Sequence, residues 1–356
     1  MQNVKGRRIL YHGALSAGQT SLYRMRALER LHQQVIPFDL IKYRFKWGKL
    51  NALRFRFPVG PLVAKINADL LAAVKSEKPE IVWFDKPTFF TQETIRRVRE
   101  SGAQTVCYNQ DNPFGPRKDG CWYQFKKIYQ MLDLHCLLRY TDVRRYRDWG
   151  LNYIKLLLSY EPLEHFPPPA GWSDKDRTRE VSYLGSPFED RARFLRTLIE
   201  THKIPLVISG LGWQNVIVGD ERERYTRAGT LQDEAGMLTG ADYRGTIWKS
   251  KINLSFITQF NEEDVAHKAF EITASGGFLL ALRSAGHLEC FDEGKEAEFF
   301  SSMEECVEKI RYYMVHPAER EEIALRGCER ARRSGYDNDT QLGRALARLE
   351  EMRQAR

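Results

Sequence analysis

Three polar residues that could take part in chemistry lie close together in the stretch EEDVAHKAFEITASGGFLLAL, residues 262–282. The pattern predicts a helix, a break at Ser275-Gly276-Gly277 and a buried strand from Phe278 to Leu282. His267, Lys268 and Glu271 share the side of that helix opposite its apolar positions. Two interpretations are open: a solvated helix face with an ion pair at i,i+3 spacing, or a polar cluster that points into a cleft.

The loop after the first expected strand, GALSAGQTS over residues 13–21, has the glycine spacing of a phosphate-binding P-loop. Gln19 stands where that motif requires the lysine that binds the β- and γ-phosphates, which argues against a nucleoside triphosphatase. The loop is then either a turn that uses Gly13 and Gly18, or a substrate loop in which Gln19, Thr20 and backbone N–H groups meet a ligand. It contains no GxGxxG fingerprint, which weakens the case for a dehydrogenase.

Three further candidates each end an expected strand, where the sites of parallel sheets form: His12, Asp85 and Asp111. An imidazole or a carboxylate at such a point could act as a general base. Each could equally cap the next helix or pair with Lys86 or Arg117. The sequence also contains D-x-D twice, at 174–176 and 337–339, but neither copy follows a buried strand, so we interpret both as surface charge and expect no metal.

Basic and aromatic residues alternate in KYRFKWGKL (42–50) and LRFRFP (53–58). The period of two predicts a pair of strands with a solvated basic face. The alternative is a surface that meets anionic lipid headgroups or an acidic polymer, with Trp47 and Phe55 near the interface. Aromatic residues among basic ones also stack on nucleic-acid bases, but no recognisable nucleic-acid-binding fold accompanies them here.

The net charge of +8 is unevenly spread along the 356 residues. The chain up to Trp172 has 28 Lys and Arg against 15 Asp and Glu, whereas the remainder has 27 against 32. Such asymmetry predicts an anionic partner for the first half. No membrane span or signal-peptide core is visible, and the six cysteines form no CxxC pair, which favours reduced thiols in a cytoplasmic protein.

The elements that must position these residues alternate between strands and helices in both halves. Apolar runs that predict strands lie at 7–13, 33–40, 81–85, 103–111, 181–186, 204–210, 251–257 and 278–282, with helical patterns between most of them. This alternation predicts parallel sheets covered by helices. The Pro-rich, charged segment at 165–180 interrupts it and is typical of an interdomain linker.

The segment 249–338 resembles the C-terminal domain of CgeB-like glycosyltransferases, which are of the group-1 type with the GT-B fold. The resemblance lies in SKINLSFIT, FEITASGGFLLAL and FDEGKEAEFFSSMEECVEKIRYYMVHPAEREEIALRGCERA, in that order. VSYLGS followed by an arginine-rich helix is similar to the usual opening of that domain. The resemblance extends more weakly to IVWFDKP and YNQDNPF in the first half.

The resemblance implies an α/β protein with two Rossmann-like doubly wound domains that face each other across a cleft. Residues 1–170 would form the acceptor domain and 171–335 the domain that holds a nucleotide-sugar. The helix at 336–356 would pack back on the first domain.

The resemblance also implies roles for the residues of the opening motif. In this fold a glutamate before the GG turn bonds the ribose hydroxyls of the donor, and the matching residue is Glu271. The diphosphate would lie at the start of that helix, here ITQFNEED, although Glu262, Glu263 and Asp264 suit an anion poorly. The other residues expected around the donor are Lys251, Asn261, His267, Lys268, Gly210, Gly276 and Gly277.

The sequence therefore predicts a metal-independent glycosyltransferase that needs no cofactor besides its nucleotide-sugar co-substrate. Its acceptor would be a glycan, a lipid-linked sugar or a protein, most simply in cell-surface polysaccharide assembly, with Asp111 as the first candidate for the base. The basic first half would dock an anionic acceptor or the inner face of the membrane. The alternative is a non-catalytic nucleotide- or sugar-binding protein of the same fold, and a degenerate P-loop protein is less favoured.

Overall fold

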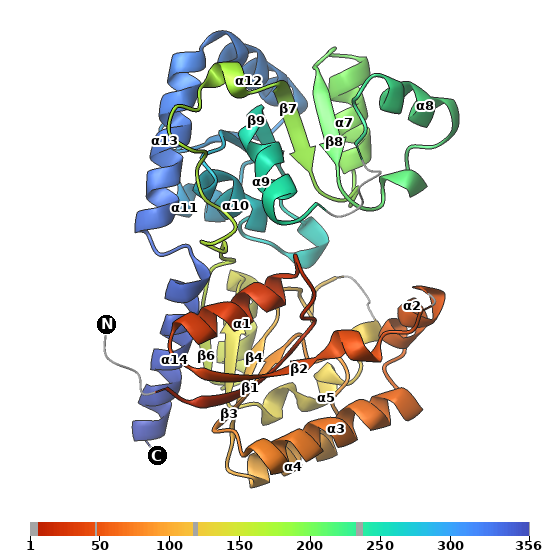
Figure 1. Ribbon diagram of the computed structural model, residues 1–356, viewed down its shortest axis with the longest axis vertical. Coiled ribbons are helices and arrows are strands. Elements are labelled where there is room, and N and C mark those ends of the chain that lie inside the picture. The colour runs from red at the N-terminus through yellow and green to blue at the C-terminus, as the bar shows by residue number, and fades with distance from the viewer. Residues whose placement is uncertain (1–5, 47, 117–119, 233–237, 356) are drawn as a thin grey trace. The chain divides into compact units, whose positions relative to one another are not determined.

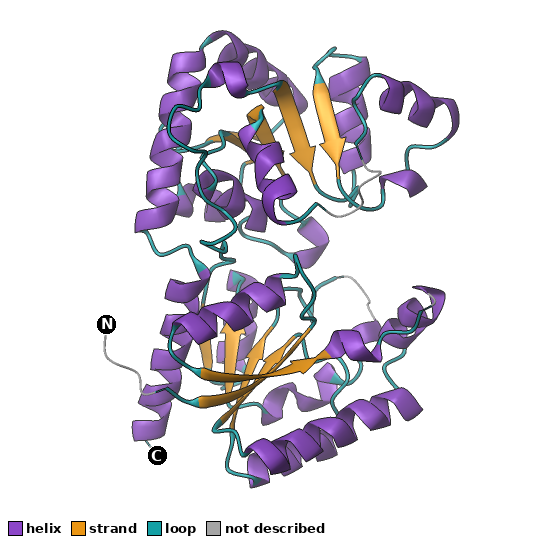
Figure 2. Cartoon of the chain, in the orientation of Figure 1, coloured by secondary structure: helices purple, strands orange, loops and turns teal. Residues whose placement is uncertain are grey.

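The computed structural model describes residues 6–46, 48–116, 120–232 and 238–355, and the chain divides into two compact units. Unit 1 comprises Met1–Leu157, Gln259–Glu262 and Asn338–Arg356. Unit 2 comprises Leu158–Thr258 and Glu263–Asp337. Each unit contains one parallel sheet covered by helices, as Figures 1 and 2 show.

Unit 1 has a six-stranded parallel sheet in the order β2-β1-β3-β4-β5-β6. Its strands are β1 (Arg8–Gly13), β2 (Gln34–Asp39), β3 (Ile81–Asp85), β4 (Gln104–Tyr108), β5 (Leu134–Leu137) and β6 (Tyr153–Lys155). All five residues of β3 are buried, as expected for a central strand covered on both faces. In register, Leu10 of β1 lies beside Val82 of β3.

Helices cover both faces of this sheet. They are α1 (Thr20–Arg30), α2 (Gly48–Arg56), α3 (Pro61–Glu77), α4 (Gln92–Glu100), α5 (Phe125–Ile128), α6 (Tyr140–Asp148) and α14 (Asn338–Gln354). Leu10, Val82 and Phe84 form a core with Leu70 of α3 and Ile95 of α4. Figure 1 shows α1 on the opposite face of the sheet from α3 and α4.

The helix α14 belongs to unit 1, although the chain reaches it only after completing unit 2. It lies along α1 and buries Leu342, Ala345, Leu346 and Leu349. Asp339 pairs with Arg30 of α1 at 2.5 Å, and Gln341 accepts a hydrogen bond from the backbone of Leu157 at 3.0 Å. Unit 1 is therefore built from distant parts of the chain.

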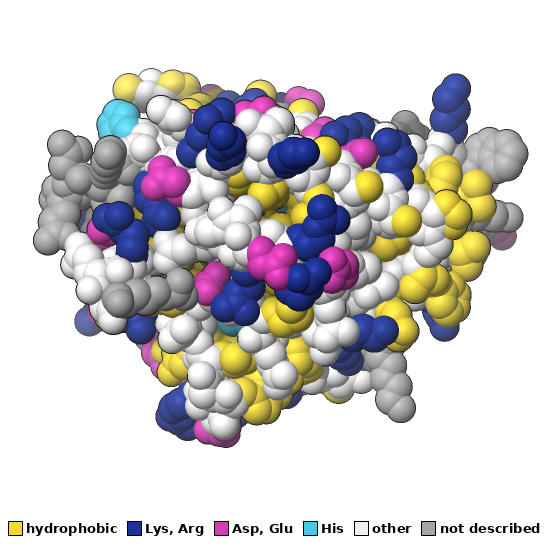
Figure 3. All heavy atoms as spheres, turned by 90° about the horizontal axis from the view of Figure 1, so that it is seen from below, with side chains coloured by type: hydrophobic (Ala, Val, Ile, Leu, Met, Phe, Trp, Pro, Cys, Tyr) yellow, Lys and Arg dark blue, Asp and Glu magenta, His cyan; other side chains and the backbone are white. Residues whose placement is uncertain are grey.

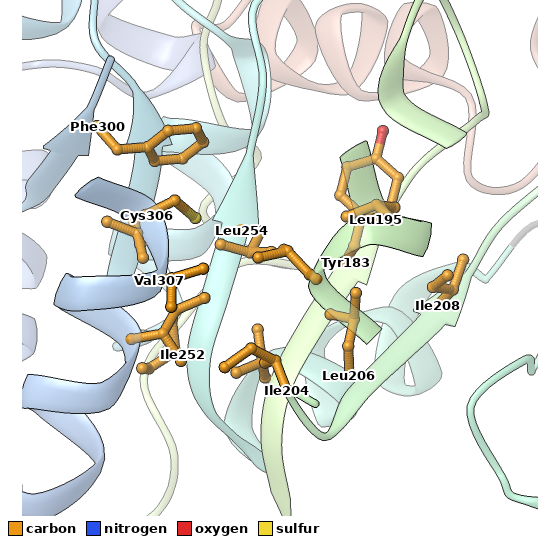
Figure 4. Packing of buried hydrophobic residues seen from close by; sticks show 14 of the residues in the cluster. Tyr183, Leu195, Ile204, Leu206, Ile208, Ile252, Leu254, Phe300, Cys306 and Val307 are labelled. Atoms are coloured by element: carbon orange, nitrogen blue, oxygen red, sulfur yellow. The ribbon is translucent and has the colours of Figure 1, made fainter. Parts of the chain in front are cut away.

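Unit 2 has a five-stranded parallel sheet in the order β11-β10-β9-β7-β8. Its strands are β7 (Arg179–Leu184), β8 (Leu206–Ser209), β9 (Ser250–Ser255), β10 (Leu279–Leu282) and β11 (Glu298–Phe300). Its helices are α7 (Arg191–Glu200), α8 (Gly219–Arg227), α9 (Gly240–Trp248), α10 (His267–Ala274), α11 (Ala285–Cys290), α12 (Met303–Val315) and α13 (Pro317–Arg333). Figure 4 shows the core, in which Ile252 and Leu254 of β9 pack with Leu206 of β8 and Val307 of α12.

Three expectations about elements are corrected by the structure. The basic–aromatic segments form the 3₁₀ turn Leu40–Tyr43 and the helix α2 rather than two strands, while Trp47 lies outside the described residues. The helix expected from residue 262 begins only at His267. The Pro-rich segment 165–180 lies within unit 2, where Trp172 packs against Trp248.

No single helix of the described residues has the length and apolar composition needed to cross a membrane. The pair formed by Leu50–Arg56 and α3 passes that test only when joined, across a bend of 73°.

Candidate functional site

Glu271 lies at the centre of a buried polar cluster in unit 2. Glu271 is only 8% exposed, although it lies on the polar side of α10. Tyr243 of α9 donates its hydroxyl to Oε2 at 2.5 Å, and Lys268 Nζ lies 3.8 Å from the same oxygen. Lys268 also donates to the Tyr243 hydroxyl at 3.1 Å. The ion pair at i,i+3 spacing therefore exists, but inside the protein rather than on a solvated face.

Two histidines approach the other carboxylate oxygen of Glu271. His267 Nε2 lies 3.7 Å and His165 Nε2 lies 3.9 Å from Oε1. His165 accepts a hydrogen bond from the backbone N–H of Glu161 at Nδ1, so its neutral ring carries the proton on Nε2, toward Glu271. His267 Nε2 also lies 2.9 Å from the carbonyl oxygen of Ser159. Within the cluster, His267, Lys268 and Glu271 are close in sequence, whereas His165 and Tyr243 come from distant parts of the chain.

The cluster keeps Glu271 ionised. Burial alone raises the pKa of this carboxyl, but His267, Lys268, His165 and the hydrogen bond from Tyr243 outweigh burial and hold the pKa well below its usual range. Burial lowers the pKa of His165 from 6.5 to about 4, against the attraction of Glu271, so His165 is neutral near pH 7. The site thus combines a permanent carboxylate with donors from a lysine, a tyrosine and imidazoles.

The start of α10 is fixed by α11. The backbone N–H of Ala266 donates to His287 Nε2 at 3.1 Å, and the Ser284 hydroxyl donates to the Asp264 carbonyl at 2.6 Å. A Cβ on Gly286 would lie 2.4 Å from that carbonyl oxygen, so the two segments touch through backbone. Ala266, the N-cap of α10, makes no side-chain cap, and the N–H of Ala269 bonds to its carbonyl oxygen at 3.0 Å.

The acids before α10 have structural partners. Glu262, in unit 1, pairs with Arg145 at 2.9 Å and accepts a hydrogen bond from Asn112 at 2.6 Å. Glu263 accepts from the backbone N–H of Thr258 at 2.8 Å. The segment ITQFNEED is therefore not a helix start, and the anion site expected there would have to lie at His267 instead.

The other residues expected around the donor are spread more widely. Lys251 is the second residue of β9, at the opposite end of the strand from the loop that leads to α10. Asn261 belongs to unit 1, where its Oδ1 accepts from the backbone N–H of Asn112 at 2.7 Å. A donor role for Lys251 and Asn261 therefore stays a prediction.

The glycines have packing reasons of their own. Gly210, with φ of 134°, follows β8, and a Cβ there would lie 2.5 Å from the Gly185 carbonyl oxygen. Gly276 has φ of 71° in the turn after α10. A Cβ on Gly277 would lie 2.6 Å from Ile247 of α9. All three positions require glycine whether or not a ligand binds nearby.

A second polar site lies in unit 1, in a pocket of about 150 Å³ that follows β3 and β4. Its lining residues are Phe55, Lys86, Asp111, Asn112, Trp122, Phe260 and Asn261. Lys86 forms an ion pair with Asp111, the partner that the sequence offered as an alternative, while Arg117 lies outside the described residues. Lys86 Nζ also lies 5.1 Å from the ring centre of Phe55 and 5.6 Å from that of Trp122.

Sequence reasoning missed the pocket roles of Lys86 and Trp122. Lys86 follows β3 with a φ of 56°, a conformation that is rare for a residue with a side chain and that often accompanies functional sites. The sequence could have indicated this role of Lys86, because the residue directly follows a buried strand. Trp122 comes from a distant 3₁₀ turn, Gly120–Trp122, so no local pattern pointed to it.

Asp85 and His12 do not reach a surface. Asp85 is bonded to Arg24 at 2.7 Å and 3.1 Å and accepts the Tyr11 hydroxyl at 2.6 Å. His12 is fully buried beside Phe90, and neither of its ring nitrogens has a hydrogen-bond partner among the described residues. Burial lowers the pKa of His12 from 6.5 to about 4. Contrary to expectation, neither can act as a base on an acceptor in this structure.

The expected substrate loop connects β1 to α1 as a tight turn. Gly18 has φ of 78°, and a Cβ on Gly13 would lie 3.1 Å from Ser21. Gln19 is the N-cap of α1 but makes no side-chain cap, and the Thr20 hydroxyl donates to Gln110 at 3.0 Å. These contacts explain the glycines by chain geometry, and a ligand role for Gln19 and Thr20 stays a prediction.

The two D-x-D motifs are engaged elsewhere. Asp174 pairs with Arg320, Asp176 caps a 3₁₀ turn through Ser173, and Asp339 pairs with Arg30. Within the described ranges, no group of three or more His, Cys, Asp or Glu side chains is arranged to hold a metal ion.

Comparison with known proteins gives one partial family match and several structural matches. Residues 190–347 match a family model described as glycosyl transferase-like. No curated protein sequence matches the chain.

Solved structures match nearly the whole chain at low identity. The sucrose-phosphate synthase of Thermosynechococcus elongatus has a TM-score of 0.68 at 13% identity, with 97% of this chain and 100% of that one covered. The glycosyltransferase of Rickettsia africae has 0.66 at 11% identity, covering 98% of each chain. HepE of Anabaena, in complex with UDP and glucose, has 0.62 at 13% identity, covering 96% and 99%. The expected GT-B class with two Rossmann-like units is confirmed as the fold.

Proposed function

We propose that the protein is a glycosyltransferase that takes its sugar from a nucleotide-sugar, with UDP as the nucleotide. The observation that carries this proposal is the buried, ionised Glu271 between Lys268 and Tyr243, on the helix before the glycine turn of unit 2. A carboxylate in this state is a strong acceptor for the two hydroxyls of a ribose. The similarity to structures solved with UDP and UDP-glucose supports the choice of nucleotide.

The leaving group of this reaction is a nucleoside diphosphate, whose developing charge must be stabilised. The first turn of α10 offers N–H groups without a capping side chain, and His267 and Lys268 lie in the same turn. A helix N-terminus with a lysine nearby can stabilise a diphosphate without a divalent ion. We therefore propose a metal-independent reaction with no cofactor besides the co-substrate.

The acceptor would bind to unit 1. Asp111 is the candidate that supports base catalysis best, because its side chain is 47% exposed in a pocket whereas Asp85 and His12 are buried. Its carboxylate would take the proton of an acceptor hydroxyl as that oxygen bonds to the anomeric carbon and the bond from this carbon to the diphosphate breaks.

We further propose membership of the CgeB-like group and a role in cell-surface polysaccharide assembly, in the cytoplasm. The six cysteines support this location, because all are buried and none is paired. The acceptor would be a glycan, a lipid-linked sugar or a protein.

The alternative is a binding protein of the same fold that transfers nothing. The ion pair at Asp111 favours it, since Lys86 occupies the carboxylate that a base would need free. A measurement of sugar transfer distinguishes the glycosyltransferase from the binding protein.

The test is incubation of the protein with UDP-, GDP-, ADP- and dTDP-sugars, with acceptors of all three classes and with EDTA present. We expect release of UDP that depends on an acceptor and is unaffected by EDTA. Asp111→Asn should lower the turnover number by about 10²–10⁴-fold, as loss of a general base does. Tight nucleotide binding without release in any mixture would favour the binding protein, and no binding to any donor would reject the proposal.

A further inference from the structure

The helix α2 has an unusual surface for an exposed helix of unit 1. Leu50 and Leu53 lie three positions apart on α2, and Phe57, the residue after its end, donates its N–H to the Leu53 carbonyl at 2.8 Å, so the three share one face. Leu53 is 55% exposed and Phe57 is 56% exposed. Phe45 and Val59 are also exposed next to the helix. Apolar side chains that gather in this way usually mark a surface that meets another phase or partner.

This apolar face is surrounded by positive charge. Residues 42–59 contain no Asp or Glu, and Lys42, Arg44, Lys46 and Arg56 are exposed. Arg54 is different, because its guanidinium donates to the Tyr43 carbonyl and lies 5.1 Å from the ring centre of Phe89. Tyr123 and Lys127, which is bonded to it at 2.7 Å, extend the surface next to α2. Figure 3 shows hydrophobic side chains with Lys and Arg among them on the side where α2 lies in Figure 1.

The inner side of α2 reaches the pocket of Asp111. Phe55 lines that pocket beside Lys86, two residues from Leu53 and two from Phe57. The segment that carries Trp122 contacts the end of α2 and the residues after it. A Cβ on Gly120 would lie 2.2 Å from the Arg56 carbonyl oxygen, and Gln124 donates to the Pro58 carbonyl at 3.0 Å. One helix therefore connects an apolar, cationic surface to a polar pocket with aromatic walls.

We infer that unit 1 takes a lipid-linked acceptor: its sugar lies in the pocket of Phe55, Lys86, Asp111 and Trp122, and its tail stays in an anionic membrane on which the α2 face rests. This rests on the proposed function and selects one of its three acceptor classes. Aromatic rings suit the C–H faces of a sugar, and Lys86 and Asp111 suit its hydroxyls. Exposed apolar side chains ringed by Lys and Arg match the interface and headgroups of an anionic bilayer. A protein partner could also cover the apolar face. Binding a protein would not require that the charged residues around this face are all cationic, whereas binding an anionic bilayer would.

The experiment measures sedimentation of the full chain with phosphatidylglycerol and phosphatidylcholine vesicles. We expect binding to phosphatidylglycerol that falls at least about tenfold between about 0.05 and 0.5 M salt. Leu53→Ser/Phe57→Ser and Arg44→Ala/Lys46→Ala/Arg56→Ala should each lower the binding at least about tenfold without changing the melting temperature. Val315→Ser/Leu325→Ser is the matched control, because both side chains are more exposed than Leu53 but lie on α12 and α13 of unit 2.

Several results would overturn this inference. One is wild-type protein that does not bind phosphatidylglycerol vesicles, and another is binding that all variants share equally. Self-association that depends on Leu53 and Phe57, without vesicle binding, would assign the surface to a protein partner. Turnover of a water-soluble acceptor without vesicle binding would reject the lipid-linked acceptor and leave the proposed function. Vesicle binding without affinity for any nucleotide-sugar would reject the proposed function and leave the docking surface.

Discussion

A buried carboxylate with a lysine and a tyrosine is not by itself a binding site, and this chain contains a second example. Glu298 of β11 is 4% exposed, accepts the Tyr313 hydroxyl at 2.6 Å and pairs with Lys309 at 2.5 Å. It resembles Glu271 in burial and partners. What distinguishes Glu271 is its place on α10 beside His165 and His267. The two residues therefore form a matched pair for an experiment.

Glu271→Gln should weaken UDP binding by about ten- to a hundredfold. The substitution keeps the shape but removes the charge assistance to the ribose hydroxyls, which is worth about 1.5–3 kcal/mol per bond. It should also lower the melting temperature, because Lys268 loses its buried counter-charge. Glu298→Gln should lower the melting temperature without changing the affinity. Calorimetric titration with UDP measures the difference, and equal affinities in both variants would remove Glu271 from the donor site.

The sequence could predict part of this cluster but not all of it. His267, Lys268 and Glu271 were expected to lie together because helical spacing is local. His165 and Tyr243 join them through the tertiary fold, from more than twenty residues away, so no periodicity could reveal them. For the same reason the burial of Asp85 by Arg24 could not be foreseen from the strand that Asp85 ends.

The turn between α10 and β10 illustrates how an element can constrain the site that it carries. A Cβ on Gly277 would meet Ile247 at 2.6 Å and Asn253 at 2.9 Å, and both of these residues are buried. The helix can therefore approach α9 and β9 closely only with glycine at this position. The same two helices are joined by the hydrogen bond from Tyr243 of α9 to Glu271 of α10.

Gly277→Ala should destabilise unit 2 by about 1–3 kcal/mol, because the added methyl group overpacks the contact with α9. Gly245→Ala in α9 is the control: nothing lies within 4 Å of its added Cβ, and the change should stabilise the helix by about 0.5–1 kcal/mol. Melting temperatures of the two variants measure these opposite shifts. If Gly277→Ala melted like the wild type but bound UDP more weakly, the glycine would serve the ligand rather than the packing.

The elements themselves were predictable to different degrees. β3 coincides with the expected range 81–85, because a continuous apolar run between polar turns is typical of a buried parallel strand. α2 was predicted as strand because basic and aromatic residues alternate over only a few positions, a pattern too short to exclude a helix. In the helix the alternation places Phe55 at the pocket and Leu53 and Phe57 on the surface.

Across the whole molecule, four histidines are buried in an uncharged state. Burial lowers the pKa of His12, His135, His165 and His287 from 6.5 to about 4. The unfolded chain takes up these protons first as the pH falls, so the stability contributed by the neutral rings is complete above pH 6.5 and is lost between pH 6.5 and 4. Within that window, each ring lowers the free energy of unfolding by about 1.4 kcal/mol for each pH unit of acidification.

We expect the melting temperature to fall steeply from pH 7.5 to 5.5, before most carboxylates titrate. His12→Leu should reduce this loss by about 1.4 kcal/mol at pH 5.5, because one fewer ring takes up a proton on unfolding. At pH 7.5 the variant should be at least as stable as the wild type, since no described residue bonds the ring nitrogens of His12. Thermal unfolding of both proteins at several pH values measures this loss of stability. If the loss is identical in the wild type and in His12→Leu, His12 has no part in the acid response.

The position of α14 has a consequence for how the protein is made. A ribosome completes the sheet of unit 1 by residue 157, but the helix that covers α1 and supplies Asp339 to Arg30 emerges roughly 180 residues later. At about 5–20 residues per second, the apolar side of α1 waits roughly 10–40 seconds for its partner. The segments assigned to unit 2 are complete once residue 337 has emerged, directly before α14 follows. The unit synthesised first therefore matures last, and in the interval a chaperone could bind the side of α1 that α14 later covers.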